Sequence, residues 1–211
     1  MADTDILVVG GGFGGAFAAR VAERLVARHG ARLTLVAPEN FLLFSPLLAE
    51  AASGTIEPRH AVVPLRELLR HTQLIAGTLE SVDHEGRSVR VCDAAGARRE
   101  IRYRTLVLSP GSVPVSLPIP GLAGNAVGFK TLADAIWLRN RVLHQLEVAD
   151  AQPAGARRDQ MLTFTFVGGG YAGVEALAEM ESLVRDALRW YPNLRRSDTR
   201  WVIVEAQDRL L

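Results

Sequence analysis

Two glycine-rich stretches limit what this chain can fold into. VVGGGFGGAFAAR, residues 8–20, is followed later by the near repeat FVGGGYAGVEALAE, residues 166–179. In each stretch an apolar run precedes Gly-x-Gly-x-x-Gly, and residues with helical spacing of apolar side chains follow it. This strand–turn–helix order is typical of a dinucleotide-binding βαβ unit. The chain is therefore predicted to be an α/β protein with two Rossmann-like units.

Each glycine of such a turn has its own task. The first allows the tight turn, the second lets the backbone approach a pyrophosphate, and the third lets the helix pack closely on the strand. The candidates are Gly10, Gly12 and Gly15 in the first turn and Gly168, Gly170 and Gly173 in the second. The helix N-terminus supplies N–H groups and partial positive charge for phosphates. One match is weak evidence because such turns also occur without a nucleotide, but two matches favour two dinucleotides.

An acidic residue at the end of the second strand of each unit would hold the ribose. In the second unit RWVIVE ends in Glu205, whose carboxylate would accept the ribose 2′-OH and repel a 2′-phosphate, which favours NADH over NADPH. Glu205 lies farther from its turn than the usual spacing of about 20 residues, and a solvated charge at a strand end is the alternative. In the first unit the strand ends at Ala37, and whether Glu39 replaces the missing acid stays open.

The remaining elements of the first unit follow from periodicity. We predict strands at 6–9 and 32–37 and a helix at 13–28. Its apolar face would hold Phe17, Val21 and Leu25, with Ala18, Ala22 and Val26 beside them. Residues 38–60 are expected to be irregular, with a short helix at 64–70. Alternation predicts an antiparallel meander at 73–83, 87–93 and 99–104, followed by a separate buried parallel strand at 105–109.

A helix is predicted near the end of the first domain, before a polar stretch. A capping box of Thr131 and Asp134 would start this helix, which runs to about residue 146. DAQPAGARRDQ is the best linker candidate, and a strand at 162–168, a helix and a strand at 200–206 follow it. The predicted organisation is a first nucleotide-binding domain at 1–150, a linker at 151–160 and the start of a second domain at 161–211.

Composition excludes several classes of function. The net charge of +1 gives no reason to expect nucleic acid as a partner. Cys92 is the single cysteine, so no disulfide scaffold and no redox-active cysteine pair can form within the chain; we expect it to be a small buried residue. The histidines lack metal-ligand spacing, so no metal site is predicted. The N-terminus has no signal-peptide pattern, and the apolar run 41–49 is too short to span a bilayer.

Taken together, the motifs resemble the type II NADH dehydrogenases, single-chain NADH:quinone oxidoreductases among the FAD flavoproteins with two dinucleotide-binding domains. The resemblance rests on the two glycine stretches and on APENFLLFSPLLAEAASGTIEPRH, YRTLVLSPGSVPVSLPIPG and GFKTLADAIWLRNRV. It implies a Rossmann-like FAD-binding domain with a small antiparallel meander, followed by the start of an NADH-binding domain. Disulfide reductases of this fold have a cysteine pair on the helix after the first turn, and GAFAARVAERL has none.

The resemblance also implies roles for single residues. Gly10, Gly12, Phe13, Gly14 and Gly15 would wrap the FAD pyrophosphate, and the backbone of Leu79 would read the adenine. Ser109, Pro110 and Gly111 match a turn near the flavin; Pro110 departs from the family pattern and removes a backbone N–H. Gly168, Gly170 and Gly173 would hold NADH. Glu175 would lie near the nicotinamide–flavin junction as the candidate catalytic residue; a carboxylate favoured by the helix dipole is the alternative.

Family members are longer, so the resemblance implies that this chain is the N-terminal part of an enzyme and is inactive alone. The expected partners are NADH and a quinone, with membrane association only through segments missing from this chain and a cytoplasmic location, peripheral on the inner face of the cell membrane in the full-length form. A homodimer fits the sequence, which does not decide the oligomeric state. Two alternatives stay open: a related flavoprotein that reduces a ferredoxin or soluble carrier, and a nucleotide-binding fragment without turnover.

Overall fold

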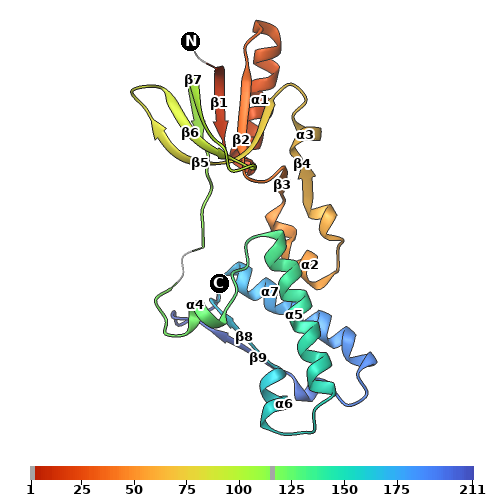
Figure 1. The fold of residues 1–211 in the computed structure, drawn as a ribbon. Coiled ribbons are helices and arrows are strands. Elements are labelled where there is room, and N and C mark those ends of the chain that lie inside the picture. Colours follow the sequence, from red (N-terminus) through yellow and green to blue (C-terminus); the bar gives the residue numbers. More distant parts are fainter. Residues whose placement is uncertain (1–2, 115–116) are drawn as a thin grey trace. The chain divides into compact units, whose positions relative to one another are not determined.

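The computed structural model describes residues 3–114 and 117–211. By packing, the chain divides into two compact units (Figure 1). The first contains the residues up to Leu43 together with Val62–Val113, and the second contains Phe44–Ala61 together with Pro114–Leu211. The division into 1–150, 151–160 and 161–211 stays a prediction, and helix α6 (Ala156–Met161) runs from the proposed linker into the proposed second domain.

Five strands of the first unit form a closed ring in the order β1-β2-β5-β6-β7. They are β1 (Thr4–Val9), β2 (Leu33–Ala37), β5 (Gln73–Asp83), β6 (Ser88–Asp93) and β7 (Arg98–Leu108). The pairs β1–β2, β1–β7 and β2–β5 are parallel, whereas β5–β6 and β6–β7 are antiparallel. The predicted α/β class with a parallel sheet and a small antiparallel meander is therefore confirmed.

The prediction of two strands at 99–104 and 105–109 was wrong. Residues 98–108 form one strand, β7, because its first half pairs with β6 and its second half continues beside β1. Strand β5 changes partners in the same way, from parallel β2 to antiparallel β6, with an irregular register between Leu79 and Ser81. A change of partner along one strand gives no signal in the alternation of its side chains.

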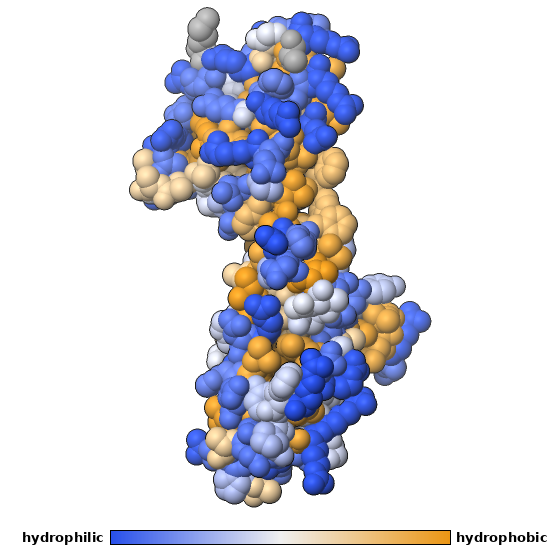
Figure 2. Space-filling model, turned by 90° about the vertical axis from the view of Figure 1, so that its right-hand side faces the viewer, coloured by the Kyte–Doolittle hydropathy of each residue, from blue (hydrophilic) through white to orange (hydrophobic). Residues whose placement is uncertain are grey.

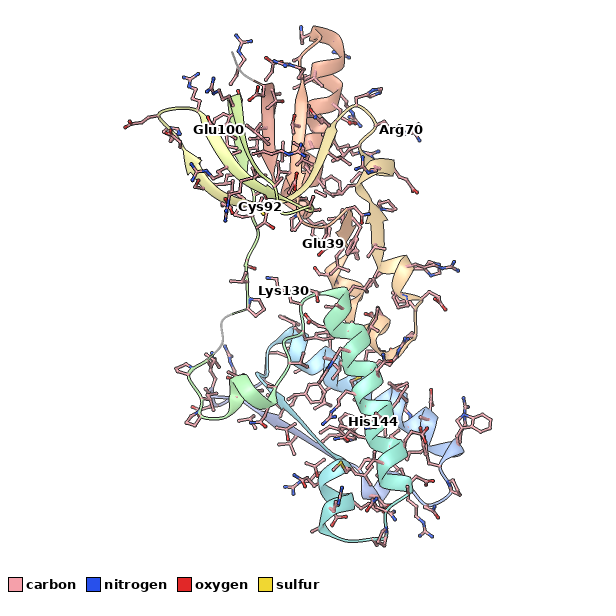
Figure 3. All side chains as sticks on the ribbon, in the orientation of Figure 1. Glu39, Arg70, Cys92, Glu100, Lys130 and His144 are labelled. Carbon is pink, nitrogen blue, oxygen red and sulfur yellow. The ribbon has the colours of Figure 1, made fainter. Side chains whose placement is uncertain are left out.

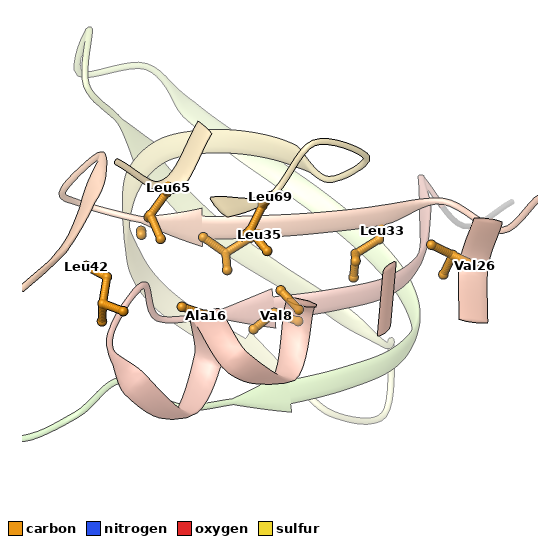
Figure 4. Packing of buried hydrophobic residues seen from close by; sticks show 10 residues of the cluster. Val8, Ala16, Val26, Leu33, Leu35, Leu42, Leu65 and Leu69 are labelled. Atoms are coloured by element: carbon orange, nitrogen blue, oxygen red, sulfur yellow. The ribbon is translucent and has the colours of Figure 1, made fainter. Parts of the chain in front are cut away.

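Helix α1 (Phe13–His29) packs on the sheet through only one edge of the predicted face, at Ala22 and Val26. Phe17, Val21 and Leu25 are 52%, 59% and 55% exposed. The buried positions Ala16, Ala19 and Val26 pack with strand residues Val8 and Leu35 and with Leu65 and Leu69, the last two from α3 (Leu65–Leu68) and its end (Figure 4). Gly15 fixes this face, because it lies against the turn and positions four and seven residues later share its side of the helix.

Residues 38–60 are more regular than predicted. They contain β3 (Phe41–Leu43), the 3₁₀ turns η1 (Ser45–Leu47) and η2 (Pro58–Ala61), and helix α2 (Leu48–Ser53). Strand β3 pairs antiparallel with β4 (Val62–Pro64). Helix α2 forms because LAEAAS lacks proline and glycine, and Gly54, with φ of 81°, ends it.

The second unit contains one βαβ crossover. Strands β8 (Thr163–Val167) and β9 (Arg200–Val204) are parallel and are joined by α7 (Tyr171–Ala187) and the 3₁₀ turns η3 (Leu188–Trp190) and η4 (Arg196–Asp198). Trp201 stacks on Phe164 with ring centroids 4.6 Å apart. The predicted capping box of Thr131 and Asp134 is confirmed at the start of α5 (Leu132–Asp150), which follows the short α4 (Leu122–Asn125).

Apolar side chains also remain on the surface, and Figure 2 shows orange apolar patches between blue hydrophilic ones on one face. Over residues 3–114 and 117–211, no helix combines the length and the apolar composition needed to cross a membrane.

Candidate functional site: two glycine turns

The first glycine turn lies where β1 meets α1. Gly10 has φ of 113°, a conformation that favours glycine, and its N–H donates to the carbonyl oxygen of Val36 at 2.8 Å. A Cβ on Gly10 would stand 1.8 Å from the carbonyl oxygen of Ser109, and a Cβ on Gly15 would stand 1.9 Å from that of Gly10. The first and third glycines are therefore required by backbone packing alone.

The second glycine leaves the turn open. Gly12 is the N-cap of α1 with φ of −75° and ψ of −170°, and no side chain caps the helix. A Cβ on Gly12 would meet no atom within 4 Å. Gly14 also faces this edge, since its Cβ would stand 2.5 Å from Ser109 Oγ, and Phe13 is 40% exposed beside it. An uncapped helix start with open space over the second glycine fits a pyrophosphate.

The second glycine turn has the same geometry. Gly168 has φ of 107° and donates to the carbonyl oxygen of Val204 at 2.9 Å. A Cβ on Gly173 would stand 2.1 Å from the carbonyl oxygen of Gly168. Gly170 is the N-cap of α7 without a side-chain cap, and a Cβ there would meet nothing within 4 Å. The two turns thus share their backbone conformation and the open space over the second glycine, although a Cβ on Gly168, unlike one on Gly10, would meet nothing within 4 Å.

Glu205 lies directly against the second turn. Its Oε2 accepts from the N–H of Gly169 at 2.5 Å, and its Oε1 accepts from the N–H groups of Ala206 at 2.7 Å and Gln207 at 3.0 Å. These backbone donors, Gly169 first, lower the pKa of the Glu205 carboxyl. The carboxylate is therefore ionised and held at the turn despite its distance along the sequence. The role of Gly169 as its donor was not predicted, although the middle glycine of GGG is visible in the sequence.

The first unit has no acid at the matching position. Strand registers pair Val9 with Val36 and Val167 with Val204, so Ala37 takes the place of Glu205. A Cβ on Gly11 would stand 2.8 Å from the Cβ of Ala37, as one on Gly169 would stand 3.3 Å from that of Glu205. Glu39 is exposed just beyond the end of β2 (Figure 3). Its backbone lies near Gly11, but its carboxylate does not repeat the contact that Glu205 makes.

The other residues predicted for the first site lie at or beyond the same edge of the sheet. Ser109 follows β7 and donates from its N–H to the carbonyl oxygen of Val9 at 2.8 Å, which places it against Gly10. Pro110 and Gly111 continue from there, and Gly111 has φ of 76°. Leu79 lies three residues past Ala76, the last residue of β5 paired with β2, and its side chain packs into the strand ring.

The structure also places Glu175 and Cys92, the two remaining side chains singled out in the sequence. Glu175 lies exposed on α7, two residues after Gly173, and its carboxylate has no hydrogen-bond partner within the described part of the chain. Cys92, expected to be a small buried residue, is half-buried in β6 (Figure 3). In residues 3–114 and 117–211 no cluster of three or more metal-ligating side chains occurs.

Comparison with known proteins agrees with this geometry. The family model described as pyridine nucleotide-disulphide oxidoreductase matches residues 4–211. The chain belongs to this family. It is 34% identical over 188 residues to an external alternative NADH-ubiquinone oxidoreductase from the mitochondria of Yarrowia lipolytica, covering 84% of this chain and 32% of that protein. The type II NADH:quinone oxidoreductase Ndh of Mycobacterium tuberculosis is 29% identical to this chain. The match covers 98% of this chain and 44% of that protein.

Solved structures show the same fold. The NDH2 of Plasmodium falciparum in complex with NADH matches with a TM-score of 0.88 and 24% identity, covering 98% of this chain and 42% of that one. The chain therefore spans about a third to under half of the length of these relatives.

Proposed function

We propose that the chain provides the two nucleotide-binding turns of an enzyme that passes a hydride from NADH through FAD to a quinone. The observation that carries the proposal is the pair of equivalent turns, of which only the second has an acid, Glu205, at the ribose position. An acid there is the feature that selects NADH. The relatives named as NADH-quinone oxidoreductases support this choice.

The residues of the first turn fit FAD. Gly12 leaves room over the N-terminus of α1 for a pyrophosphate, and Gly14 lets Ser109 lie close beside this opening. FAD, when bound, supplies the redox chemistry between a nicotinamide and an acceptor, while the protein binds and orients the reactants. The chain has a single cysteine, which cannot provide the cysteine pair of a disulfide reductase. A quinone is therefore a better-supported acceptor than a disulfide.

The second turn would hold NADH, with Gly170 facing its pyrophosphate and Glu205 its ribose. Glu175, exposed at the start of α7, would lie toward the nicotinamide end. We further propose that the whole protein works peripherally at the inner face of the cell membrane, where a quinone is available, and that it forms a homodimer.

Titration of the purified chain with FAD tests the proposal. We expect a yellow protein that retains one FAD per chain after gel filtration and quenches the fluorescence of added NADH. Gly12→Val, which fills the open space over the first turn, is the matched variant and should abolish retention of FAD only. A folded chain that binds neither nucleotide would overturn the proposed function.

A further inference from the structure

We propose that Ser53, Thr55 and Glu179 form a positioning cluster that holds the start of α7 in its NADH-binding geometry. The Ser53 hydroxyl donates to Glu179 Oε2 at 2.6 Å, and the Thr55 hydroxyl reaches the same oxygen at 3.1 Å. All three residues belong to the second compact unit. The inference rests on the proposed function, because α7 begins at the second glycine turn.

The proton inventory of the cluster favours this arrangement. Ser53 Oγ and Thr55 Oγ1 lie 2.8 Å apart, and each hydroxyl has one proton to donate. An ionised carboxylate can only accept, so Glu179 is satisfied when both hydroxyls donate to it. The carbonyl oxygen of Glu50, 3.0 Å from Ser53 Oγ, competes for the Ser53 proton, and Ser53 Oγ itself accepts from the N–H of Thr55 at 3.2 Å. A 2.6 Å O–H···O⁻ distance is typical of a strong, charge-assisted hydrogen bond.

Local structure brings the two hydroxyls together. Ser53 is the last residue of α2 and is only 9% exposed. Gly54 then turns the chain with φ of 81°, so that Thr55 returns to the same carboxylate. Helix α2 packs on both α5 and α7, as Figure 1 shows. A buried hydroxyl with a charged partner is costly to separate, because the carboxylate would remain half-buried without its donors.

The position of Glu179 on α7 links the cluster to the nucleotide turn. Glu179 follows Glu175 by one helical turn and precedes Met180, which is fully buried. No side chain caps the first turn of α7. Helix α7 also packs on β8 and β9, and the cluster adds lateral support from α2 two turns into the helix, which steadies the direction in which the first turn and Glu175 point. The groups of a binding site must be positioned to within about 0.5 Å. The cluster contributes to this precision through α7 and does not itself contact the nucleotide.

Hydrogen exchange and NADH titration of the intact chain test the inference together. Ser53→Ala and Glu179→Ala should raise exchange of the amides at 171–178 without ligand and weaken NADH binding about tenfold, the scale of coupling between two sites. Glu179→Gln keeps an oxygen that can accept from both hydroxyls. It should therefore show amide exchange and NADH affinity close to those of the unsubstituted chain. Ser182→Ala is the control, since its hydroxyl on the same helix accepts from exposed Arg185 at 2.8 Å.

The outcomes separate this inference from the proposed function. Unchanged exchange and unchanged NADH affinity in both alanine variants, with normal NADH binding by the unsubstituted chain, would overturn the inference and leave the function standing. An unsubstituted chain that binds no NADH would overturn both. If Glu179→Ala unfolds, Ser53→Ala decides the question, with Ser182→Ala as its control.

Discussion

The carboxylate of Glu205 accepts a hydrogen bond from the backbone N–H of Gly169 at 2.5 Å. The contact joins the end of β9 to the glycine turn that opens α7, so an acid far along the chain becomes part of the turn. The matching contact in the first unit is between Gly11 and Ala37, where no acid is present. This difference between the turns supports the proposal that they hold different nucleotides.

Glu205→Ala is expected to reduce the preference for NADH over NADPH by about ten- to a hundredfold, because removal of a hydrogen bond to a charged group costs about 1.5–3 kcal/mol. The loss of charge also removes the repulsion of a 2′-phosphate. Dissociation constants of both nucleotides, measured by quenching of their fluorescence, give the ratio. Asp208→Ala, which removes an exposed acid three residues on, is the control. An unchanged ratio in Glu205→Ala would refute the assignment.

Alanine substitutions in the first turn should separate folding from nucleotide binding. Gly15→Ala would place a Cβ 1.9 Å from the carbonyl oxygen of Gly10, so the helix must move and we expect a loss of several kcal/mol in the free energy of unfolding, within the range of severe core changes. Gly12→Ala meets no atom and has an extended backbone that alanine accepts. It should keep the stability but weaken FAD binding. Denaturant unfolding and FAD titration of both variants check this, and equal effects of the two would contradict the assigned roles.

The sequence predicts the turns well because the third glycine of each is required by a backbone contact within its own motif. Gly10 with Gly15, and Gly168 with Gly173, meet within six residues. Contacts between distant segments give no such signal. The place of Ser109 against Gly10, the bond between Ser53 and Glu179, and the change of partner along β7 depend on tertiary packing. The burial of Phe17, Val21 and Leu25 on α1 was wrongly predicted for the same reason. These are the larger apolar side chains of the helix, and the sequence does not show that the smaller ones face the sheet.

Substitutions on α1 check the corrected face. Val21→Gln changes a side chain that is 59% exposed and should shift the free energy of unfolding by less than about 0.5 kcal/mol. Ala19→Leu adds volume at a fully buried position against the sheet and should cost about 1–3 kcal/mol. Urea unfolding of the two variants gives both values. A larger loss in Val21→Gln would restore the face predicted from the sequence.

The capping box at α5 gives a stability change with a defined pH dependence. Asp134 N–H donates to Thr131 Oγ1 at 3.1 Å, and Asp134 Oδ2 accepts from the N–H groups of Thr131 at 2.8 Å and Lys130 at 3.0 Å. Burial raises the pKa of the Asp134 carboxyl, but the N–H donors outweigh it and the pKa is lowered. Thr131→Ala should cost about 1 kcal/mol at pH 7.

Because the pKa of Asp134 is lower in the folded state than in the unfolded chain, its contribution to stability is present above the unfolded value of about 3.9. That contribution is lost as the pH falls through the folded pKa. Asp134→Asn lacks a titrating group, so its difference in stability from the unsubstituted chain should shrink between pH 5 and the acid range. Thermal unfolding of both proteins across this range measures the difference. A gap that stayed constant with pH would show that the Asp134 charge does not stabilise the start of α5.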